Sequence, residues 1–390
     1  MSGLVRLAAR WLAFHRGRTL LLVGCLALAF LLPITVSRLM AAQGDRMRAR
    51  AVATPYVVGA PGSRYDLVVS SLWFRGRTPG STSMREIDRV EGDGRGVAVP
   101  LLVRHSAGGL PLVGTSYDYF ERRGLHPAQG RLPAILGEAV LGATAAERSG
   151  VGVDGHVLTD ADGLLGMGIE YPVRLRVVGV LAPSGSADDE AVFTDLQTTW
   201  LVEGLLHGHA DAAQQDPARV LGHDDQGAPR LDSGIVQYTE VTADNLDSFH
   251  LHGELADMPL TGILVWPNDE RGRTILLGRY GVAKDAQMLQ PTEVVDELLG
   301  FVASLKRFFD AQTWLVGIAT ALLLVLVVAL TIRTRERELL TLRRIGVSRA
   351  RVAALLGIEV GVVLVAAAAL ASVAGWALAR VLARSLGLPS

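Results

Sequence analysis

Three long apolar runs limit what this chain can fold into more than any other feature of its sequence. They cover residues 19–36, 314–332 and 352–378, and the first holds 18 residues without a charge. At about 1.5 Å per residue, a helix of that length measures about 27 Å, close to the hydrocarbon thickness of a bilayer. A mean hydropathy of +0.32 agrees with this interpretation. We therefore predict three transmembrane helices, at residues 19–36, 311–332 and 352–379.

Residues 1–18 are predicted to form an interfacial helix on the cytoplasmic side. Between Leu4 and His15, apolar side chains alternate with Arg6 and Arg10, as they do in helices that lie along a membrane surface. A cleaved signal peptide is the alternative, because basic residues precede the first run and small residues follow it.

The positions of the arginines predict the orientation of the spans. Residues 333–351 carry seven arginines against Glu336 and Glu338, and four more arginines precede the first run. Short loops rich in basic residues stay in the cytoplasm. The loop 333–351 and the N-terminus are therefore predicted inside, and residues 37–310 outside. The tail 380–390 then lies outside as well, although Arg380 and Arg384 argue mildly against this.

The external segment is predicted to be an α+β domain. Stretches rich in β-branched residues predict strands at 65–69, 97–103, 110–113, 171–181 and 262–266. Short helices are predicted at 83–90, 137–148 and 195–206, and the polar stretch 207–230 predicts a long surface loop. The fold class is thus an α-helical membrane protein with a large extracytoplasmic α+β domain between its first and second spans.

Two segments connect this domain to the spans. Apolar residues recur every three or four positions over 292–310, and they are spaced among polar residues over 37–51. Both segments are predicted to extend the neighbouring membrane helices outward as paired stalk helices under the domain. A stalk of this kind can carry movement.

The residue counts exclude several kinds of catalytic site. Only Lys284 and Lys306 are lysines and neither follows a glycine, so no Gly-Lys-Ser/Thr phosphate-binding loop exists. No serine nucleophile elbow or His-Glu-x-x-His helix occurs, and the single cysteine, Cys25, excludes a zinc site built from several thiolates. A net charge of −1 gives no general attraction to nucleic acid. We expect no enzymatic activity and no nucleic-acid partner.

Gly150, Gly152 and Gly155 have the spacing of a dinucleotide-binding loop. That motif needs a strand before it and a helix opening on it, whereas a helix-like stretch precedes these glycines and a short strand, 156–158, follows them. We therefore predict a tight turn that includes Asp154.

Five histidines within 46 residues raise the hypothesis of a metal site. They are His207, His209, His223, His250 and His252. Imidazoles beside aspartates suit a divalent transition metal, with His207, His209 and His223 as candidate ligands. We favour the alternative, a polar loop followed by a strand with two histidines on one face.

Glu359 lies about seven residues inside the third apolar run. A carboxylate within a membrane costs up to about 3 kcal/mol and needs a partner. The alternatives are pairing with Arg349 or Arg351, a bond across a helix interface, and a proton relay. We favour the interface role.

The loop between the second and third runs has the features of a binding surface. It reads RTRERELLTLRRIGVSRARVAALLGIE, in which residues 336–345 predict a short amphipathic helix, Gly346 a break and Ser348 the cap of the next helix. A solvated basic loop is the alternative, but the leucines and isoleucine are too apolar for an exposed loop. A partner surface would cover them.

This layout resembles the MacB-type, or FtsX-like, ABC transporter permeases, in which one membrane helix precedes a large external domain and the others follow it. Residues 335–349 are similar to the family's R-E-x-E-L-x-x-L-R-x-x-G-x-S-R motif, and external runs such as VVGAPGSRYDLVVSSLWF and GEAVLGATAAERSGVGVDG are similar to its periplasmic core. Family members usually carry a fourth span, so we expect either a truncated chain or three spans per subunit.

The resemblance implies a permease subunit of the bacterial inner membrane that docks on a separate cytoplasmic ABC ATPase. The docking residues would be Arg335, Glu336, Glu338, Leu339, Leu342, Arg343, Arg344, Gly346 and Ser348. ATP and magnesium would bind to the partner, with no cofactor on this chain. The implied activity is mechanotransmission, in which ATP hydrolysis moves the periplasmic domain to export or extract a substrate from the periplasm or outer leaflet.

Further partners follow from the same resemblance. They are a second permease in a homodimer or a pair, membrane lipid, and a periplasmic adaptor or outer-membrane protein. Two alternatives to transport stay open at this point: a non-transporting regulator of a periplasmic enzyme, and a membrane-anchored metal or ligand sensor.

Overall fold

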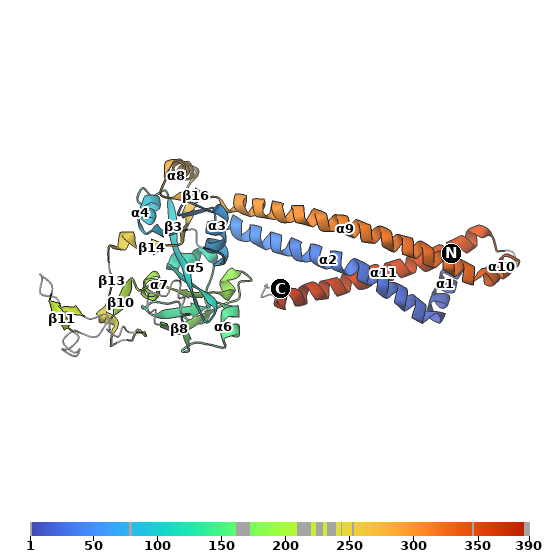
Figure 1. Cartoon of the computed structure of the whole chain (residues 1–390), viewed down its shortest axis with the longest axis horizontal. Helices are drawn as coiled ribbons and strands as arrows, with labels where there is room; N and C mark the ends of the chain where they lie inside the picture. The colour runs from blue at the N-terminus through green and yellow to red at the C-terminus, as the bar shows by residue number, and fades with distance from the viewer. Residues whose placement is uncertain are drawn as a thin grey trace. The chain divides into compact units, whose positions relative to one another are not determined.

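In the computed structural model, the chain divides into two compact units (Figure 1). Residues Met1–Arg46 and Glu297–Ser390 form one, here called the helical unit, and Met47–Asp296 form the other, here called the folded domain. The structure describes residues 2–77, 80–160, 172–208, 220–223, 229–231, 239–242, 244–251, 253–344 and 347–385.

Helices make up the described part of the helical unit. They are α1 (Ser2–Phe14), α2 (Arg16–Val52), α9 (Pro291–Thr334), α10 (Glu336–Arg344) and α11 (Arg349–Ser385). Among the described residues, three stretches are long and apolar enough to cross a membrane: Arg16–Val52, Asp310–Thr334 and Arg349–Leu382. Each contains one of the three apolar runs of the sequence.

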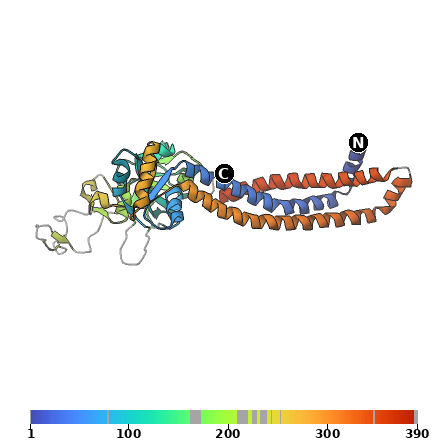
Figure 2. The same cartoon turned by 90° about the horizontal axis from the view of Figure 1, so that it is seen from above.

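Small side chains let α2, α9 and α11, here called the membrane-type helices, approach one another. Figures 1 and 2 show α2, α9 and α11 lying alongside one another. A Cβ atom on Gly375 of α11 would lie only 3.2 Å from the Ile34 side chain of α2. One buried cluster joins α1, α2 and α11 and contains Leu12, Leu26, Ala27, Val363, Ala367 and Ala371.

The folded domain is built on a mixed sheet. Among the described residues the sheet has ten strands in the order β16-β1-β15-β3-β4-β9-β6-β8-β5, with β7 paired to β8. The pairs β4–β9 and β6–β8 are parallel, and the other pairs are antiparallel. The strands are β1 (Tyr56–Gly59), β3 (Gly96–Ala107), β4 (Leu110–Thr115), β5 (Pro127–Gly130), β6 (Glu138–Leu141), β7 (His156–Leu158), β8 (Arg174–Leu181), β9 (Val192–Thr194), β15 (Gly262–Pro267) and β16 (Gln287–Leu289).

Short helices and two-stranded sheets complete the domain. The helices are α3 (Arg64–Trp73), α4 (Arg85–Glu91), α5 (Tyr117–Arg123), α6 (Ala143–Ser149), α7 (Leu196–Val202) and α8 (Glu270–Val282), and the 3-10 helices are η1 (Ala187–Glu190), η4 (Leu246–Ser248) and η5 (Leu255–Asp257). The smaller strand pairs are β2 (Thr82–Ser83) with β14 (Pro259–Leu260), β10 (Leu206–Gly208) with β13 (Phe249–Leu251), and β11 (Val220–His223) with β12 (Pro229–Leu231). This mixture confirms the predicted α+β domain.

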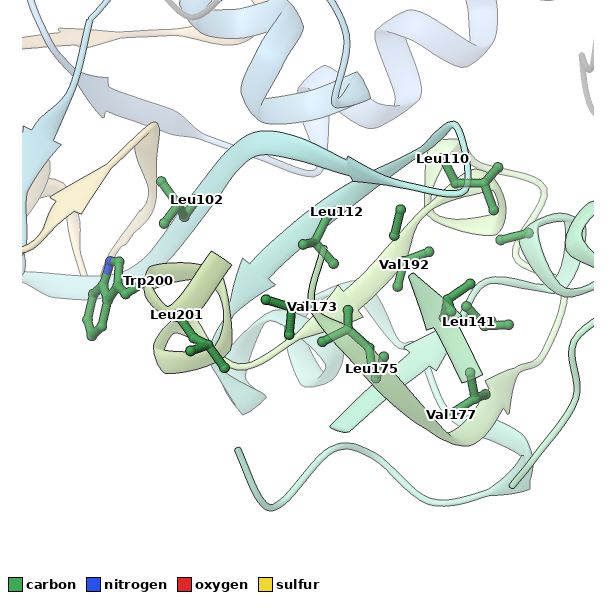
Figure 3. Close-up of a cluster of buried hydrophobic side chains, with 14 of the residues drawn as sticks. Leu102, Leu110, Leu112, Leu141, Val173, Leu175, Val177, Val192, Trp200 and Leu201 are labelled. Carbon is green, nitrogen blue, oxygen red and sulfur yellow. The ribbon is translucent and has the colours of Figure 1, made fainter. Parts of the chain in front are cut away.

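A large buried cluster packs against the β4–β9–β6–β8 side of the sheet. Figure 3 shows its side chains gathered around the strands, with Trp200 and Leu201 of α7 at one end. Leu112, Leu141 and Leu175 come from three of these strands and are fully buried. Burial of each such side chain contributes about 1.5–3 kcal/mol, so this cluster holds the strands in register.

The strand predicted at 65–69 is wrong, because these residues lie in helix α3. Ser63 caps the helix by accepting a hydrogen bond from the Asp66 backbone N–H at 3.2 Å, and the Asp66 carboxylate favours the positive end of the helix dipole. The buried residues Leu67, Val68 and Leu72 recur at helical spacing. That spacing outweighed the β-branched composition.

The single helix predicted over 137–148 is a strand followed by a helix. Residues 138–141 form β6, which is buried between β9 and β8, and α6 starts at Ala143. Between them, a Cβ atom on Gly142 would lie 2.2 Å from the Asp188 carbonyl oxygen, so only glycine allows the close approach of η1.

The other predicted elements fall close to the observed ones. The helix predicted over 195–206 ends at Val202, before Gly204 with φ of +74°. The strand predicted from 171 begins at Arg174, and residue 171 lies outside the described residues. The turn predicted at Asp154 is confirmed, with φ of +67° at that residue. Most of the predicted loop 207–230 also lies outside the described residues.

Candidate functional site

The predicted docking segment is a separate short helix, α10. It follows α9 after Arg335, and α11 begins at Arg349. Ser348 caps α11 as predicted, because its Oγ accepts a hydrogen bond from the Arg351 backbone N–H at 3.4 Å. Glu336, Leu340 and Arg344 are exposed on α10.

Several predicted docking residues are described only in part. Leu339 and Leu342 are three positions apart on α10, a spacing that places both on one side of a helix. Their side chains, and those of Glu338 and Arg343, lie outside the described atoms, and Gly346 lies outside the described residues.

Arg335 is turned into the helical unit rather than exposed beside α10. Its guanidinium lies 3.2 Å from the Glu359 carboxylate of α11, and its Cζ atom lies 3.9 Å from the centre of the Trp11 ring of α1. Both charged side chains are about nine-tenths buried. The partner of Glu359 is thus Arg335, not Arg349 or Arg351.

This contact joins three helices at the start of the docking segment. Trp11 also stacks on His15, with ring centres 4.3 Å apart, and the His15 ring is within hydrogen-bond distance of the Trp11 carbonyl. A cavity of about 50 Å³ beside Glu359 is lined mainly by apolar residues of α1, α2, α9 and α11. We infer that Arg335 and Glu359 fix the position of α10 against the membrane-type helices.

A second constellation, which the sequence did not predict, lies at the end of α2. The Arg50 guanidinium makes two hydrogen bonds to Asp188 of η1, at 2.7 and 2.8 Å, and its Nε donates to the Leu72 carbonyl of α3. Both charged side chains are more than nine-tenths buried. We call Arg50, Leu72, Tyr119 and Asp188 the α2 anchor.

Aromatic rings surround the α2 anchor. The Tyr119 hydroxyl of α5 donates to Asp188 at 2.5 Å, and Ser186 donates to the same carboxylate at 2.7 Å. The Arg50 guanidinium lies 5.5 Å from the centre of the Phe74 ring, which packs edge-on against Phe193. The carboxylate is therefore fully hydrogen-bonded in a buried pocket, where a charge pair is strong and costly to break.

The electrostatics of the anchor follow from this geometry. Burial alone would raise the pKa of Asp188, but the Arg50 charge and the hydrogen bonds from Arg50, Tyr119 and Ser186 lower it to about 2. Burial and the neighbouring Asp188 carboxylate raise the pKa of Tyr119, so its hydroxyl stays protonated. Burial also lowers the pKa of Arg123, which donates to Thr54 at 2.6 Å.

Acid is expected to weaken the folded domain through Asp188. Its pKa falls from 3.8 to about 2 on folding, so its contribution is complete above about pH 4 and is lost as the pH falls towards 2. The shift corresponds to about 2 kcal/mol. The free energy of unfolding, measured between pH 5 and pH 2, should therefore fall more steeply in the wild type than in Asp188→Asn. Equal slopes would contradict this role.

The structure brings two of the five clustered histidines together. His207 of β10 and His250 of β13 are cross-strand partners with ring centres 4.9 Å apart. His209, His252 and the His223 side chain lie outside what the structure describes. Among the described residues, no group of three or more His, Cys, Asp or Glu residues is placed to hold a metal ion.

Comparison with known families covers most of the chain. Residues 27–222 match the MacB-like periplasmic core domain, which is half of the sequence, and residues 313–389 match the FtsX-like permease C-terminal region. The chain belongs to the MacB/FtsX-type permeases. Members of this family are ABC transporter components of the inner membrane with a periplasmic domain, and they normally work with a cytoplasmic ABC ATPase. The resemblance found in the sequence is thus confirmed.

Solved structures of low sequence identity are also similar to this permease. The periplasmic region of MacB from Actinobacillus actinomycetemcomitans is 12% identical, with 63% of this chain and 94% of that chain covered and a TM-score of 0.35. The extracellular domain of the noncanonic ABC-type transporter YknZ from Gram-positive bacteria is 10% identical, with 60% and 98% covered and a TM-score of 0.31. No curated protein matches the chain.

Proposed function

We propose that this permease couples ATP hydrolysis by a separate cytoplasmic ATPase to movement of its folded domain. The ATPase binds α10, and the membrane-type helices transmit the change to the domain in the periplasm. ATP and magnesium bind to the ATPase and not to this chain. The moved domain exports or extracts a substrate from the periplasm or the outer leaflet of the membrane.

The observation that carries the proposal is the continuity of α2. This helix contains the first apolar run and continues without a break to Val52. Its last turn includes Arg50, which the buried anchor holds by Asp188 and the Leu72 carbonyl. A helix that is continuous and firmly held at its end transmits displacement better than a flexible linker does.

The second support is the position of α10. Its N-terminal neighbour Arg335 is held by Glu359 of α11 and by Trp11 of α1. A force applied to α10 therefore reaches two other helices of the unit through buried contacts and not only through the chain. The seven arginines of residues 333–351, against only two glutamates, favour a cytoplasmic position for α10.

The test is reconstitution of the full-length chain with its ABC ATPase in lipid nanodiscs. The permease alone should hydrolyse no ATP, and the complex should hydrolyse ATP at a rate different from that of the ATPase alone. An ATPase that neither binds the permease nor changes its rate on addition of the permease would contradict the proposal.

A further inference from the structure

A polar cavity of the folded domain lies next to the α2 anchor. Its volume is about 410 Å³, within the range of about 300–1,000 Å³ that is usual for small-molecule sites. The walls come from the residues after α3, the β3–β4 hairpin, α6 and η1. Gly108 and Gly109 form the hairpin turn with φ of +59° and +73°. Positive φ at both positions of a two-residue turn strongly favours glycine.

Cationic side chains dominate the lining of this cavity. Arg75, Arg104 and Arg148 line it from three different segments, and His105 is a further lining residue. Arg75 pairs with Glu190 at 2.5 Å, and Arg104 pairs with Glu203 at 3.2 Å. The two ion pairs neutralise two of the three arginines, which leaves one positive charge in excess.

Arg148 supplies that excess charge. It lies on α6 and is exposed, and no ion pair joins it to any of the residues that the structure describes. A planar guanidinium binds carboxylate and phosphate groups through two parallel hydrogen bonds. Phe74, Val103 and Leu110 line another part of the cavity and offer an apolar surface beside the cations.

We propose that this cavity binds a small anionic ligand, whose carboxylate or phosphate group is held by Arg148 with Arg75 and Arg104. The ligand competes with Glu190 for the Arg75 guanidinium. Because Glu190 ends η1, which also carries Asp188, the site adjoins the anchor of α2 directly. Phe74 belongs to both, since it lines the cavity and lies beneath the Arg50 guanidinium.

The test measures the binding of inorganic phosphate and of succinate to the full-length chain in detergent by isothermal titration calorimetry. Arg148→Gln should weaken the binding of the preferred anion at least about fivefold, because a charge-assisted hydrogen bond is lost. Glu190→Gln should strengthen it by a similar factor, because the competing carboxylate is removed. The two probes distinguish a phosphate from a dicarboxylate ligand.

The matched control is Arg176→Gln on β8. This arginine is exposed, as Arg148 is, but it is ion-paired to Asp154 at 3.0 Å and does not line the cavity. The Arg176→Gln variant should bind the anion with the same affinity as the wild type. Absence of saturable binding of both probes, an equal loss in Arg176→Gln, or no gain in Glu190→Gln would overturn the proposal. Binding at this site needs no ATPase, so its failure leaves the proposed coupling function standing.

Discussion

Replacing Arg50 by methionine should lower the free energy of unfolding of the folded domain by about 3–5 kcal/mol. The substitution leaves the Asp188 carboxylate buried without the guanidinium that makes two hydrogen bonds to it. Chemical denaturation of the full-length chain, followed by tryptophan fluorescence, measures the change. Trp200 is buried in the core of this domain and reports its unfolding.

Arg48→Met is the matched control for this experiment. Arg48 lies two residues away on the same helix and also pairs with a carboxylate, Asp296, at 2.7 Å, but both side chains are more than half exposed. Its loss should cost less than about 1 kcal/mol. The double variant Arg50→Met with Asp188→Leu should recover much of the stability, since no unpaired charge is then buried. Equal effects of Arg50→Met and Arg48→Met would show that burial gives the anchor no special role.

Replacing Leu342 by aspartate should reduce the permease-dependent ATPase activity of the complex by at least about tenfold. A carboxylate within an apolar docking surface is desolvated without a partner, and a loss of about 1.4 kcal/mol already corresponds to a factor of ten in binding. Leu339→Asp should have the same effect, because the two residues lie on one side of α10.

The control for this pair of variants is Thr341→Asp. Thr341 is an exposed residue of the same helix, and its hydroxyl donates to the Arg337 carbonyl at 2.9 Å. It receives the same charge at a position between the two leucines. If Thr341→Asp lost as much activity as Leu342→Asp, the added negative charge on α10 and not the loss of an apolar contact with the ATPase would explain the result. Full activity in Leu339→Asp and Leu342→Asp would remove α10 as the docking element.

The sequence predicted the elements whose signals are local. The apolar runs, the helix predicted over 336–345 and the cap of the next helix at Ser348 are visible within a window of about 20 residues. The structure has helices at these places, with α10 over Glu336–Arg344. The segment 65–69 misled the prediction because its composition favours a strand. The cap at Ser63 was the better signal, since it satisfies the backbone of a helix start.

The functional contacts were harder to predict because they join distant parts of the chain. Arg50 and Asp188 are 138 residues apart. An arginine in a predicted stalk helix does not by itself indicate a buried ion pair. The position of Glu359 in an apolar run predicts that it needs a partner. The sequence motif, however, assigns its partner Arg335 to the docking surface. The sequence shows that a charged residue in an apolar segment needs a partner, but the identity of that partner follows only from the three-dimensional structure.

The most direct test of coupling is the distance between the folded domain and the membrane-type helices during ATP binding. Spin labels at Leu158→Cys on β7 and Val373→Cys on α11 occupy exposed positions, in a Cys25→Ser background without other cysteines. Pulsed electron paramagnetic resonance on the permease–ATPase complex, with labelled chains diluted by unlabelled ones, should show a shift on the order of 5 Å when ATP is trapped. Identical distances with and without ATP, in a complex that hydrolyses ATP, would contradict transmission of movement to the domain.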